Sequence, residues 1–412
     1  MNPDNRIPDN RIPDNRIPGN RIPVWPLTAT LAVQTLATMA LYSLPTLAPA
    51  VAADLDVPGT LAGGFVAIAY GVGVISALIS PGLIRRHGGV RATQAVLLAA
   101  TGMVAIAATG SSVAQLAFAA LVLGLAYGAS APASAHLLVP HTPRPIFNMV
   151  MSLRQIGVPL GGVCAALILP PLVPLLGWRG ALALELIPMV ALIALMEIPR
   201  RSWDKDREPA RPAFGRTLLQ PFLLLADGRI RRLSYASFIY SGLQLTFVAF
   251  MTVHLTSVVR LDLVTAGWFL AVYQVAGSVS RPIWGWVADR FLTPTRTLAV
   301  HGVGMAVAAI VVGQFGPAWP VAGLAAVAVF AGCTACAYTG VAYAEFAALG
   351  GARRTEATGL GTAMMFSSVM LIPPAFGIAV GVLGGYGSSY IAVAVLALSA
   401  VVCLLWPTRR QD

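Results

Sequence analysis

The stretch YGSSYIAVAVLALSAVVCLLW, residues 386–406, contains no charged residue. A helix of about 20 largely apolar residues is long enough to cross the ~30 Å hydrocarbon layer of a bilayer. Comparable stretches predict twelve membrane-spanning helices, at residues 24–50, 60–82, 92–110, 113–138, 147–175, 180–198, 233–257, 264–288, 295–315, 319–348, 357–383 and 386–406. The sequence therefore predicts an all-α membrane protein.

The composition of the 412 residues supports this class. Hydrophobic residues make up 57% of the chain and charged residues 10%, whereas soluble domains carry about 25% charged residues. This excludes an ordinary soluble protein. The cysteines all lie inside apolar stretches, so neither a disulfide framework nor a zinc ribbon is indicated. We interpret Cys333-Thr-Ala-Cys336 as small-residue helix packing rather than a redox motif.

One long polar connection divides the predicted spans. Residues 199–232 form this loop, which leaves a six-helix bundle at 24–198 and a second at 233–406. Residues 1–23 carry the repeat DNRIP with proline at every fifth position, which forbids a regular helix, and we expect a disordered tail. Residues 407–412 form a short second tail.

The two predicted bundles resemble each other. An offset of 204 residues pairs Gly73 with Gly277 and Arg86 with Arg290. Parallel repeats of this kind form a substrate site between the halves near the membrane midplane, which rocking of the halves exposes to each side in turn. We therefore expect two pseudo-symmetric six-helix bundles.

Basic residues concentrate on one side of the predicted spans. The side that holds both termini carries most of the 27 Lys and Arg residues, whereas the connections on the other side carry only Arg179 and Arg260. Basic connections face the cytoplasm, so we expect cytoplasmic termini in a bacterial-type inner membrane. Topology and attraction to the lipid bilayer then explain the net charge of +11, and no nucleic-acid partner is expected.

The end of the predicted eighth span carries a motif. Gly285-Trp-Val-Ala-Asp289-Arg290 resembles the Gly-x-x-x-Asp-Arg loop motif of the Major Facilitator Superfamily, whose members have twelve spans divided six and six. The resemblance implies that Asp289 and Arg290 hold one face of a transporter shut. A topological anchor is the alternative. In the first half Arg85 occupies the aspartate position, so we carry over only a basic role, to Arg86.

The fifth span contains Arg154-Gln155-Ile-Gly157-Val-Pro159-Leu-Gly161-Gly162. This segment resembles the Gly-Pro-x-x-Gly-Gly motif of exporters in the superfamily, with the proline displaced by one residue. A proline removes one helix hydrogen bond and glycines permit close helix approach. A structural kink and a functional hinge are both compatible with the pattern.

Two arginines lie deep in predicted spans. Arg281 precedes Asp289 by eight residues, about 12 Å along a helix, and Arg154 lies about 10 Å into the fifth span. A charge at such depth requires a partner or a cavity. Ser280-Arg281-Pro282 also resembles the eighth span of the monocarboxylate transporter branch, which implies that Arg281 binds a substrate carboxylate, with Gly277 where that branch has an aspartate. No embedded acid is clearly at the depth of Arg281, so we expect an anionic substrate.

Polar side chains at helical spacing predict the rest of the site. We expect the substrate to be oriented by Gln34, Tyr42, Gln244, Tyr273 and Gln274. His254 and Glu345 are candidate proton carriers. The alternatives are a structural histidine and an inner-gate ion pair of Glu345 with Arg353 or Arg354.

These expectations add up to a transporter rather than an enzyme. The sequence lacks catalytic signatures, so we expect no catalytic residue, metal or cofactor. We predict a monomeric secondary transporter of a small organic anion, a monocarboxylate, working by alternating access with protons as the candidate coupling ion. A multidrug or metabolite exporter and a membrane sensor that binds ligand without transport are the alternatives.

Overall fold

The computed structural model describes residues 21–57, 61–210 and 220–406, and within these ranges it contains helices and no strand. The predicted all-α class is confirmed. The repeat tail at 1–20 and the end at 407–412 lie outside the described residues.

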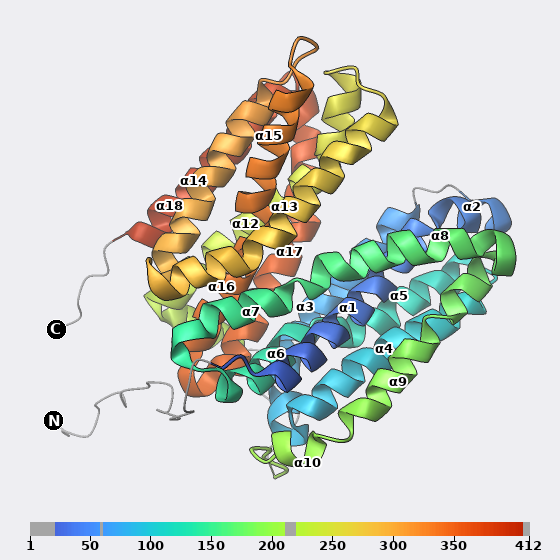
Figure 1. Ribbon diagram of the computed structural model, residues 1–412, viewed down its shortest axis with the longest axis vertical. Coiled ribbons are helices and arrows are strands. Elements are labelled where there is room, and N and C mark those ends of the chain that lie inside the picture. The colour runs from blue at the N-terminus through green and yellow to red at the C-terminus, as the bar shows by residue number, and fades with distance from the viewer. Residues whose placement is uncertain (1–20, 58–60, 211–219, 407–412) are drawn as a thin grey trace.

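Within the described residues, the first half of the chain contains nine helices of eight or more residues. They are α1 (Val24–Thr46), α2 (Ala48–Leu55), α3 (Leu61–His87), α4 (Gly89–Ala108), α5 (Val113–Tyr127), α6 (Ser130–Leu138), α7 (Phe147–Gln155), α8 (Gly157–Ala183) and α9 (Leu186–Met196). Figure 1 shows them gathered in one bundle, blue to green.

The second half forms a matching bundle, yellow to red in Figure 1. Its elements are α12 (Gly228–Ser257), α13 (Leu263–Arg290), α14 (Pro294–Gly313), α15 (Val321–Ala331), the π-helical turn η5 (Gly332–Cys336), α16 (Tyr338–Gly350), α17 (Arg354–Val382) and α18 (Tyr386–Leu405). Short helices connect the longer ones: η1 (Val139–His141), η2 (Arg144–Ile146), α10 (Arg200–Trp203), α11 (Gln220–Leu223), η4 (Leu224–Ala226) and η6 (Gly351–Arg353).

Short polar side chains begin several of the long helices. Ser112 accepts a hydrogen bond from the backbone N–H of Gln115 at the start of α5, and Asp227 accepts one from Arg229 at the start of α12. Thr293 does the same before α14, where Pro294 supplies a helical φ. These caps satisfy N–H groups that have no partner inside the helix.

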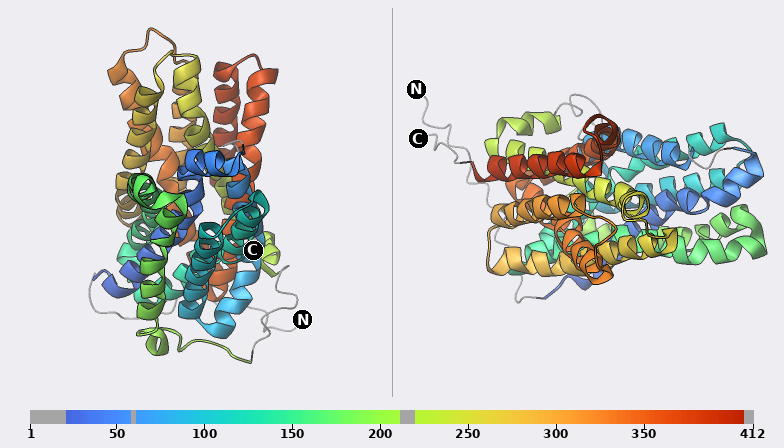
Figure 2. Two further views of the ribbon diagram at one scale, coloured as in Figure 1. Left: turned by 90° about the vertical axis from the view of Figure 1, so that its right-hand side faces the viewer. Right: turned by 90° about the horizontal axis from the view of Figure 1, so that it is seen from above.

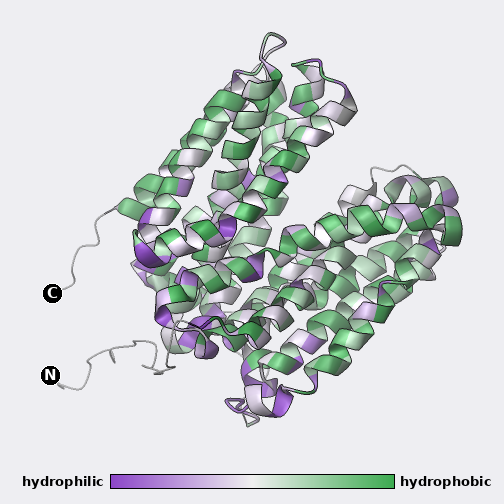
Figure 3. Ribbon diagram, viewed as in Figure 1, coloured by the Kyte–Doolittle hydropathy of each residue, from purple (hydrophilic) through white to green (hydrophobic). Residues whose placement is uncertain are grey.

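The described residues contain nine stretches long and apolar enough to cross a membrane. Two of them, Arg144–Met196 and Val321–Val382, have 53 and 62 residues, which is enough for two crossings each. Together with α13, these stretches accommodate the twelve predicted spans. Large apolar side chains point outward, such as Leu167, which is 70% exposed, and Leu175, which is 78% exposed, and Figure 3 shows apolar residues over the helix surfaces. Such surfaces suit lipid rather than water.

Several predicted spans are broken near their middle. The stretch 147–175 divides at Ile156 into α7 and α8, and 319–348 divides at η5. Proline explains the first break, because Pro159 lacks the N–H that would bond the carbonyl of Gln155 in a continuous helix. A glycine with φ of 68°, Gly177, separates the fifth predicted span from the sixth within α8.

The two bundles meet at one end and diverge at the other (Figures 1 and 2). We call the end where they meet the loop face; it carries α10 and the connections from α3 to α4 and from α13 to α14. The opposite face carries α2 and the bend of α8. On the loop face Gly285 packs against the backbone of Met149, and Gly340 against Ser152. Side chains at these glycines would overlap the other half, so the contact requires glycine.

Glycines also fix the packing inside each half. A Cβ atom at Gly161 would lie 2.8 Å from the backbone nitrogen of Met39 in α1, whereas one at Gly162 would come no closer than 3.5 Å to its nearest neighbour, the ring of Tyr42. We predict that Gly161→Ala lowers the thermal unfolding midpoint of the purified protein, because overpacking costs about 1–3 kcal/mol.

Gly162→Ala is the matched control on the same helix, and we expect it to leave the midpoint unchanged or raise it, since alanine favours helix by up to about 1 kcal/mol. Equal midpoints for the two variants would contradict the close contact of α1 with α8.

Candidate substrate-binding site and gate

A cavity of about 130 Å³ lies between the two halves. Five of the predicted site residues line it: Gln34, Tyr42, Arg154, Gln244 and Arg281. The first three come from the first half and the last two from the second. The helices that carry them lie far apart in sequence, so the fold brings together residues that the sequence could only propose one at a time.

Arg154 is 2% exposed and is held by neutral oxygens. Its Nη2 atom donates to the carbonyl of Ser130 at 3.0 Å and to the hydroxyl at 2.8 Å, and its Nη1 atom donates to Oε1 of Gln155. The hydroxyl of Ser130 in turn donates to Oε1 of Gln34 at 2.7 Å. Ser130 therefore connects the guanidinium of Arg154 to the polar face of α1.

Arg281 is 3% exposed and also binds carbonyls. Its Nε atom donates to the carbonyl of Cys336 at 3.1 Å, and its Nη1 atom donates to the carbonyl of Gln155. Both carbonyls come from irregular helix. The Gln155 carbonyl is the one that Pro159 leaves unpaired, and Cys336 ends the π-helical turn, a distortion that is frequent at functional sites.

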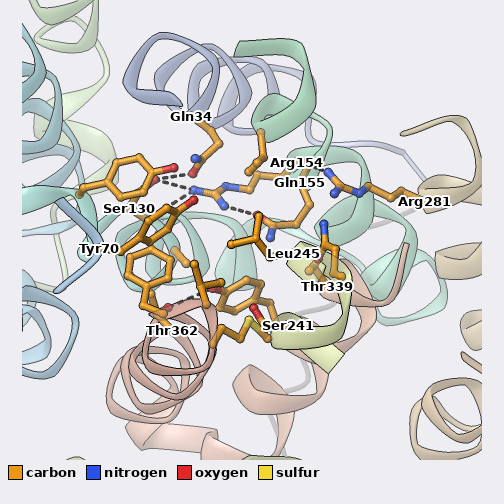
Figure 4. A pocket seen from close by; sticks show the side chains of 18 of the residues that line it. Gln34, Tyr70, Ser130, Arg154, Gln155, Ser241, Leu245, Arg281, Thr339 and Thr362 are labelled. Carbon is orange, nitrogen blue, oxygen red and sulfur yellow. Dashed lines mark hydrogen bonds between the residues drawn. The ribbon is translucent and has the colours of Figure 1, made fainter. Parts of the chain in front are cut away.

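Neither arginine is neutralised by a carboxylate. None of the ion pairs found within the described residues involves Arg154 or Arg281. Gln155 lies between them, as Figure 4 shows, and contributes one side-chain and one backbone oxygen. Two buried positive charges thus face one cavity with only dipoles around them, an arrangement suited to an anion.

The remaining polar groups extend from α1 into the first half. The Nε2 atom of Gln34 donates to the hydroxyl of Thr38 at 2.8 Å, and Thr38 shares a hydrogen bond of 3.2 Å with the hydroxyl of Tyr127. This chain of hydrogen bonds fixes the amide of Gln34 at the cavity wall, and its substrate-orienting role stays a prediction.

Aromatic rings form another part of the cavity wall. The ring of Phe366 in α17 stacks on that of Tyr127, with centroids 5.7 Å apart, and meets the ring of Tyr70 edge-on at 4.8 Å. All three line the cavity. Tyr70 and Tyr127 belong to the first half and Phe366 to the second, so the apolar wall also spans the two halves.

Two predicted site residues lie behind the cavity wall rather than among its lining residues. The hydroxyl of Tyr273 donates to the carbonyl of Gln244 at 3.3 Å, and Oε1 of Gln274 lies 3.6 Å from the sulfur of Cys336. Gly277 packs directly on Cys336, which agrees with small-residue packing for that cysteine. Tyr273 and Gln274 therefore contact the residues that surround Arg281.

The two predicted proton carriers lie away from the cavity. His254 is buried, its Nε2 atom is 3.0 Å from the carbonyl of Val312, and aromatic rings surround it. Glu345 accepts a hydrogen bond from Thr295 at 3.4 Å. The loop-face arginine Arg354 pairs with Asp206 instead. Neither His254 nor Glu345 lines the cavity.

Asp289 connects the two halves on the loop face. Its carboxylate accepts hydrogen bonds from the backbone N–H of Asn148 at 3.0 Å and of Met149 at 2.9 Å, and from the side-chain amide of Asn148 at 2.8 Å. These groups form the N-terminus of α7, where free N–H groups favour a negative charge. The contact joins the two halves, and the gate role of Asp289 stays a prediction.

The corresponding contact of the first half has reversed charge. Arg85, at the end of α3, donates to the carboxylate of Glu356 at 2.6 Å and to the carbonyl of Ala352 at 3.0 Å. Glu356 lies in the first turn of α17. The ion pair is thus made by Arg85 rather than by Arg86, the predicted gate residue beside it, and Arg290 is exposed at the end of α13.

The central loop adds a third connection on the loop face. Nε2 of His136 lies 3.2 Å from the carboxylate of Asp206, and Nη2 of Arg354 lies 3.7 Å from the same carboxylate. The hydrogen bond from His136 lowers the pKa of Asp206 below its usual range. Asp206 therefore bridges the first half to the second.

Several residues of this arrangement were not predicted as site residues, among them Ser130, Gln155 and Glu356. Gln155 carried a signal, because Pro159 four residues later marks its carbonyl as free. Arg85 at an aspartate position signalled an altered gate, although nothing in the sequence identified Glu356 as its partner.

Comparisons with known proteins agree with this architecture. A family model described as Major Facilitator Superfamily matches residues 30–346 and 236–412. The fucose:proton symporter FucP of E. coli is similar in structure, with a TM-score of 0.71 at 15% identity over 94% of this chain and 100% of that one. The human organic anion transporter MFSD10 gives a TM-score of 0.70 at 16% identity over 92% and 98%. No curated protein sequence matches the chain significantly.

The ion pair of Arg85 with Glu356 can be tested by reversing its charges. We predict that Arg85→Glu opens the loop face, because Glu356 has a side chain only 4% exposed and breaking a buried pair costs about 3–5 kcal/mol. Hydrogen–deuterium exchange should become faster at the start of α7 and of α17.

The double variant Arg85→Glu with Glu356→Arg restores the pair in the opposite sense, and we expect exchange to slow again. Arg296→Gln is the control, since Arg296 is exposed at the same face. A double variant that exchanges as fast as Arg85→Glu would exclude the ion pair as a gate.

Proposed function

The chain belongs to the Major Facilitator Superfamily, and from this we propose that it is a secondary active transporter that carries a small organic anion, a monocarboxylate, by alternating access. The family and the fold support secondary transport. The nature of the substrate is our inference from the cavity.

The observation that carries this proposal is the pair of buried arginines without a carboxylate partner. Arg154 and Arg281 come from opposite halves, line the same cavity and are bound by neutral oxygens. Burying a charge is costly unless an opposite charge compensates it. A carboxylate between the two guanidinium groups would supply that compensation, and planar guanidinium groups bind carboxylates with two hydrogen bonds.

Size and surface chemistry favour one carboxylate rather than several. The cavity volume of about 130 Å³ is close to that of a cavity of about 150 Å³ that holds benzene. Tyr70, Tyr127 and Phe366 form an aromatic part of its wall. A small molecule with a carboxylate at one end and an apolar body at the other fits both features.

The gate contacts support alternating access. In this conformation the loop face is closed by Asp289 on α7 and by Arg85 on Glu356. We propose that the loop face is cytoplasmic, which makes the conformation outward-facing, and that the halves rock about the arginines. Opening the loop face would break both contacts, so each contributes to the equilibrium between the two states.

Proton coupling, the inner-membrane location, cytoplasmic termini and a monomeric state belong to the same proposal. His254 and Glu345 remain candidate proton carriers, but they do not line the cavity. The substrate-orienting roles of Gln34, Tyr42, Gln244, Tyr273 and Gln274 likewise remain proposals.

Two alternatives make different predictions. A multidrug or metabolite exporter of the same fold would keep its resistance phenotype in Arg281→Gln, because the substrate would not depend on that charge. A sensor would bind ligand but catalyse no counterflow of labelled substrate in proteoliposomes.

The test measures ligand binding by the thermal unfolding midpoint of the purified protein. A ligand that binds the folded state raises its unfolding midpoint, and we expect benzoate or lactate to do so while the neutral benzyl alcohol does not. Hydrogen bonds to a charged group contribute about 1.5–3 kcal/mol, so Arg281→Gln should weaken carboxylate affinity by roughly 10- to 100-fold.

Arg290→Gln is the control, because it removes an exposed charge from the same helix. Stabilisation by neutral sugars or by cations, with no response to carboxylates, would show that the proposed substrate class is wrong.

A further inference from the structure

A third buried ionisable group lies outside the cavity. Glu185 is 2% exposed and lies between α8 and α9, where Pro188 interrupts the helix by lacking the N–H that would bond the carbonyl of Leu184. Its Oε1 atom is 2.5 Å from the hydroxyl oxygen of Ser43 in α1. Its Oε2 atom is buried and has no hydrogen-bond partner among the described residues.

Counting hydrogens shows which protonation state fits this geometry. The hydroxyl oxygen of Ser43 lies 2.7 Å from the carbonyl of Met39 and 2.5 Å from Glu185, and a serine has a single hydrogen to donate. A carboxylate would compete with the carbonyl for that hydrogen. A carboxylic acid donates its own hydrogen to Ser43, and Ser43 then donates to Met39, so both contacts are satisfied.

Among the residues that the structure describes, none near Glu185 offers a free compensating charge for its ionised form. The charges of the elements packed around it are engaged elsewhere or exposed. On α8, Arg179 pairs with Asp54 of α2 at 2.8 Å, and on α4, Arg91 pairs with Glu197 beyond the far end of α9 at 3.0 Å. Asp56 at the end of α2 is exposed, and α1 contains no charged residue.

We propose that Glu185 is the proton-binding carboxyl that couples this carrier to a proton gradient. The proposal rests on the proposed transport function and assigns the coupling ion a site. In this conformation Glu185 holds the proton as a neutral acid. Release leaves a carboxylate, which needs water or a cation and therefore favours a conformation in which water reaches the contact of Glu185 with α1.

The position of Ser43 links this site to the cavity. Ser43 follows Tyr42, a cavity residue, and α1 also carries Gln34. The proton on Glu185 therefore bonds to the helix that presents two cavity side chains. His254 instead bonds a carbonyl of α14, and Glu345 a threonine near the loop face.

The first test reads the proton directly and needs no substrate. Infrared spectroscopy of the purified protein at neutral pH should show a carboxylic-acid C=O stretch that Glu185→Gln lacks. Ser43→Ala should shift this band to higher wavenumber, because the acid loses its acceptor, which provides a readout if Glu185→Gln folds poorly. A band unchanged in both variants, or no such band in the wild type, would overturn the protonated state.

The second test reads coupling in proteoliposomes with labelled lactate, corrected for uptake by protein-free vesicles. Glutamine keeps the shape and can donate to Ser43, so Glu185→Gln should retain lactate exchange. A pH gradient should no longer drive lactate accumulation by this variant, so that its lactate uptake equals the uptake measured without a gradient. Glu197→Gln is the control at the other end of α9 and should accumulate lactate as the wild type does.

Accumulation by Glu185→Gln equal to that of the wild type would refute the coupling role. Absence of lactate or benzoate exchange in the wild type would instead refute the carboxylate substrate, and the infrared band would still decide whether Glu185 holds a proton.

Discussion

Two guanidinium groups held by carbonyls of broken helices are the arrangement on which the central site depends. An unbroken fifth span would use the carbonyl of Gln155 in its own hydrogen bonding, and Arg281 would lose an acceptor from the other half. Pro159 releases that carbonyl. Arg154, in the last turn of α7 before the break, donates to Ser130. Two buried charges are thus tolerated because irregular backbone provides the dipoles that bind them.

Two charged side chains, Asp289 and Arg85, also hold the halves together on the loop face. Asp289 binds backbone N–H groups of α7, whereas Arg85 binds a side chain at the start of α17. The two contacts occupy equivalent places in the two halves. They differ in the charge of the residue at the helix end, which is negative for Asp289 and positive for Arg85. Each joins the end of one helix to the beginning of a helix in the other half. The internal repeat therefore preserved the place of the contact and changed its chemistry.

Local patterns predicted a large part of this structure. Apolar stretches indicated the helices, and the depth of Arg154 and Arg281 indicated a polar cavity, because both signals depend on residue type and spacing alone. The pairing of Arg85 with Glu356 could not be predicted, since those residues are far apart in sequence. Pro159 marks the carbonyl of Gln155 as free, but the carbonyl of Cys336 could not be identified from the sequence, because every residue has one. The proposed domain boundaries remain predictions.

The glycine contacts on the loop face have a consequence for the balance between conformations. Gly285 and Gly340 lie against backbone of the other half, so closing this seam immobilises few side-chain rotamers. Long side chains would lose rotamer entropy on closure and regain it on opening, which would bias the molecule. The backbone contacts at these two glycines keep that entropic bias small, and ion pairs such as that of Arg85 with Glu356 add to it. When the two conformations differ little in free energy, a ligand that binds one of them only modestly better than the other can shift their populations.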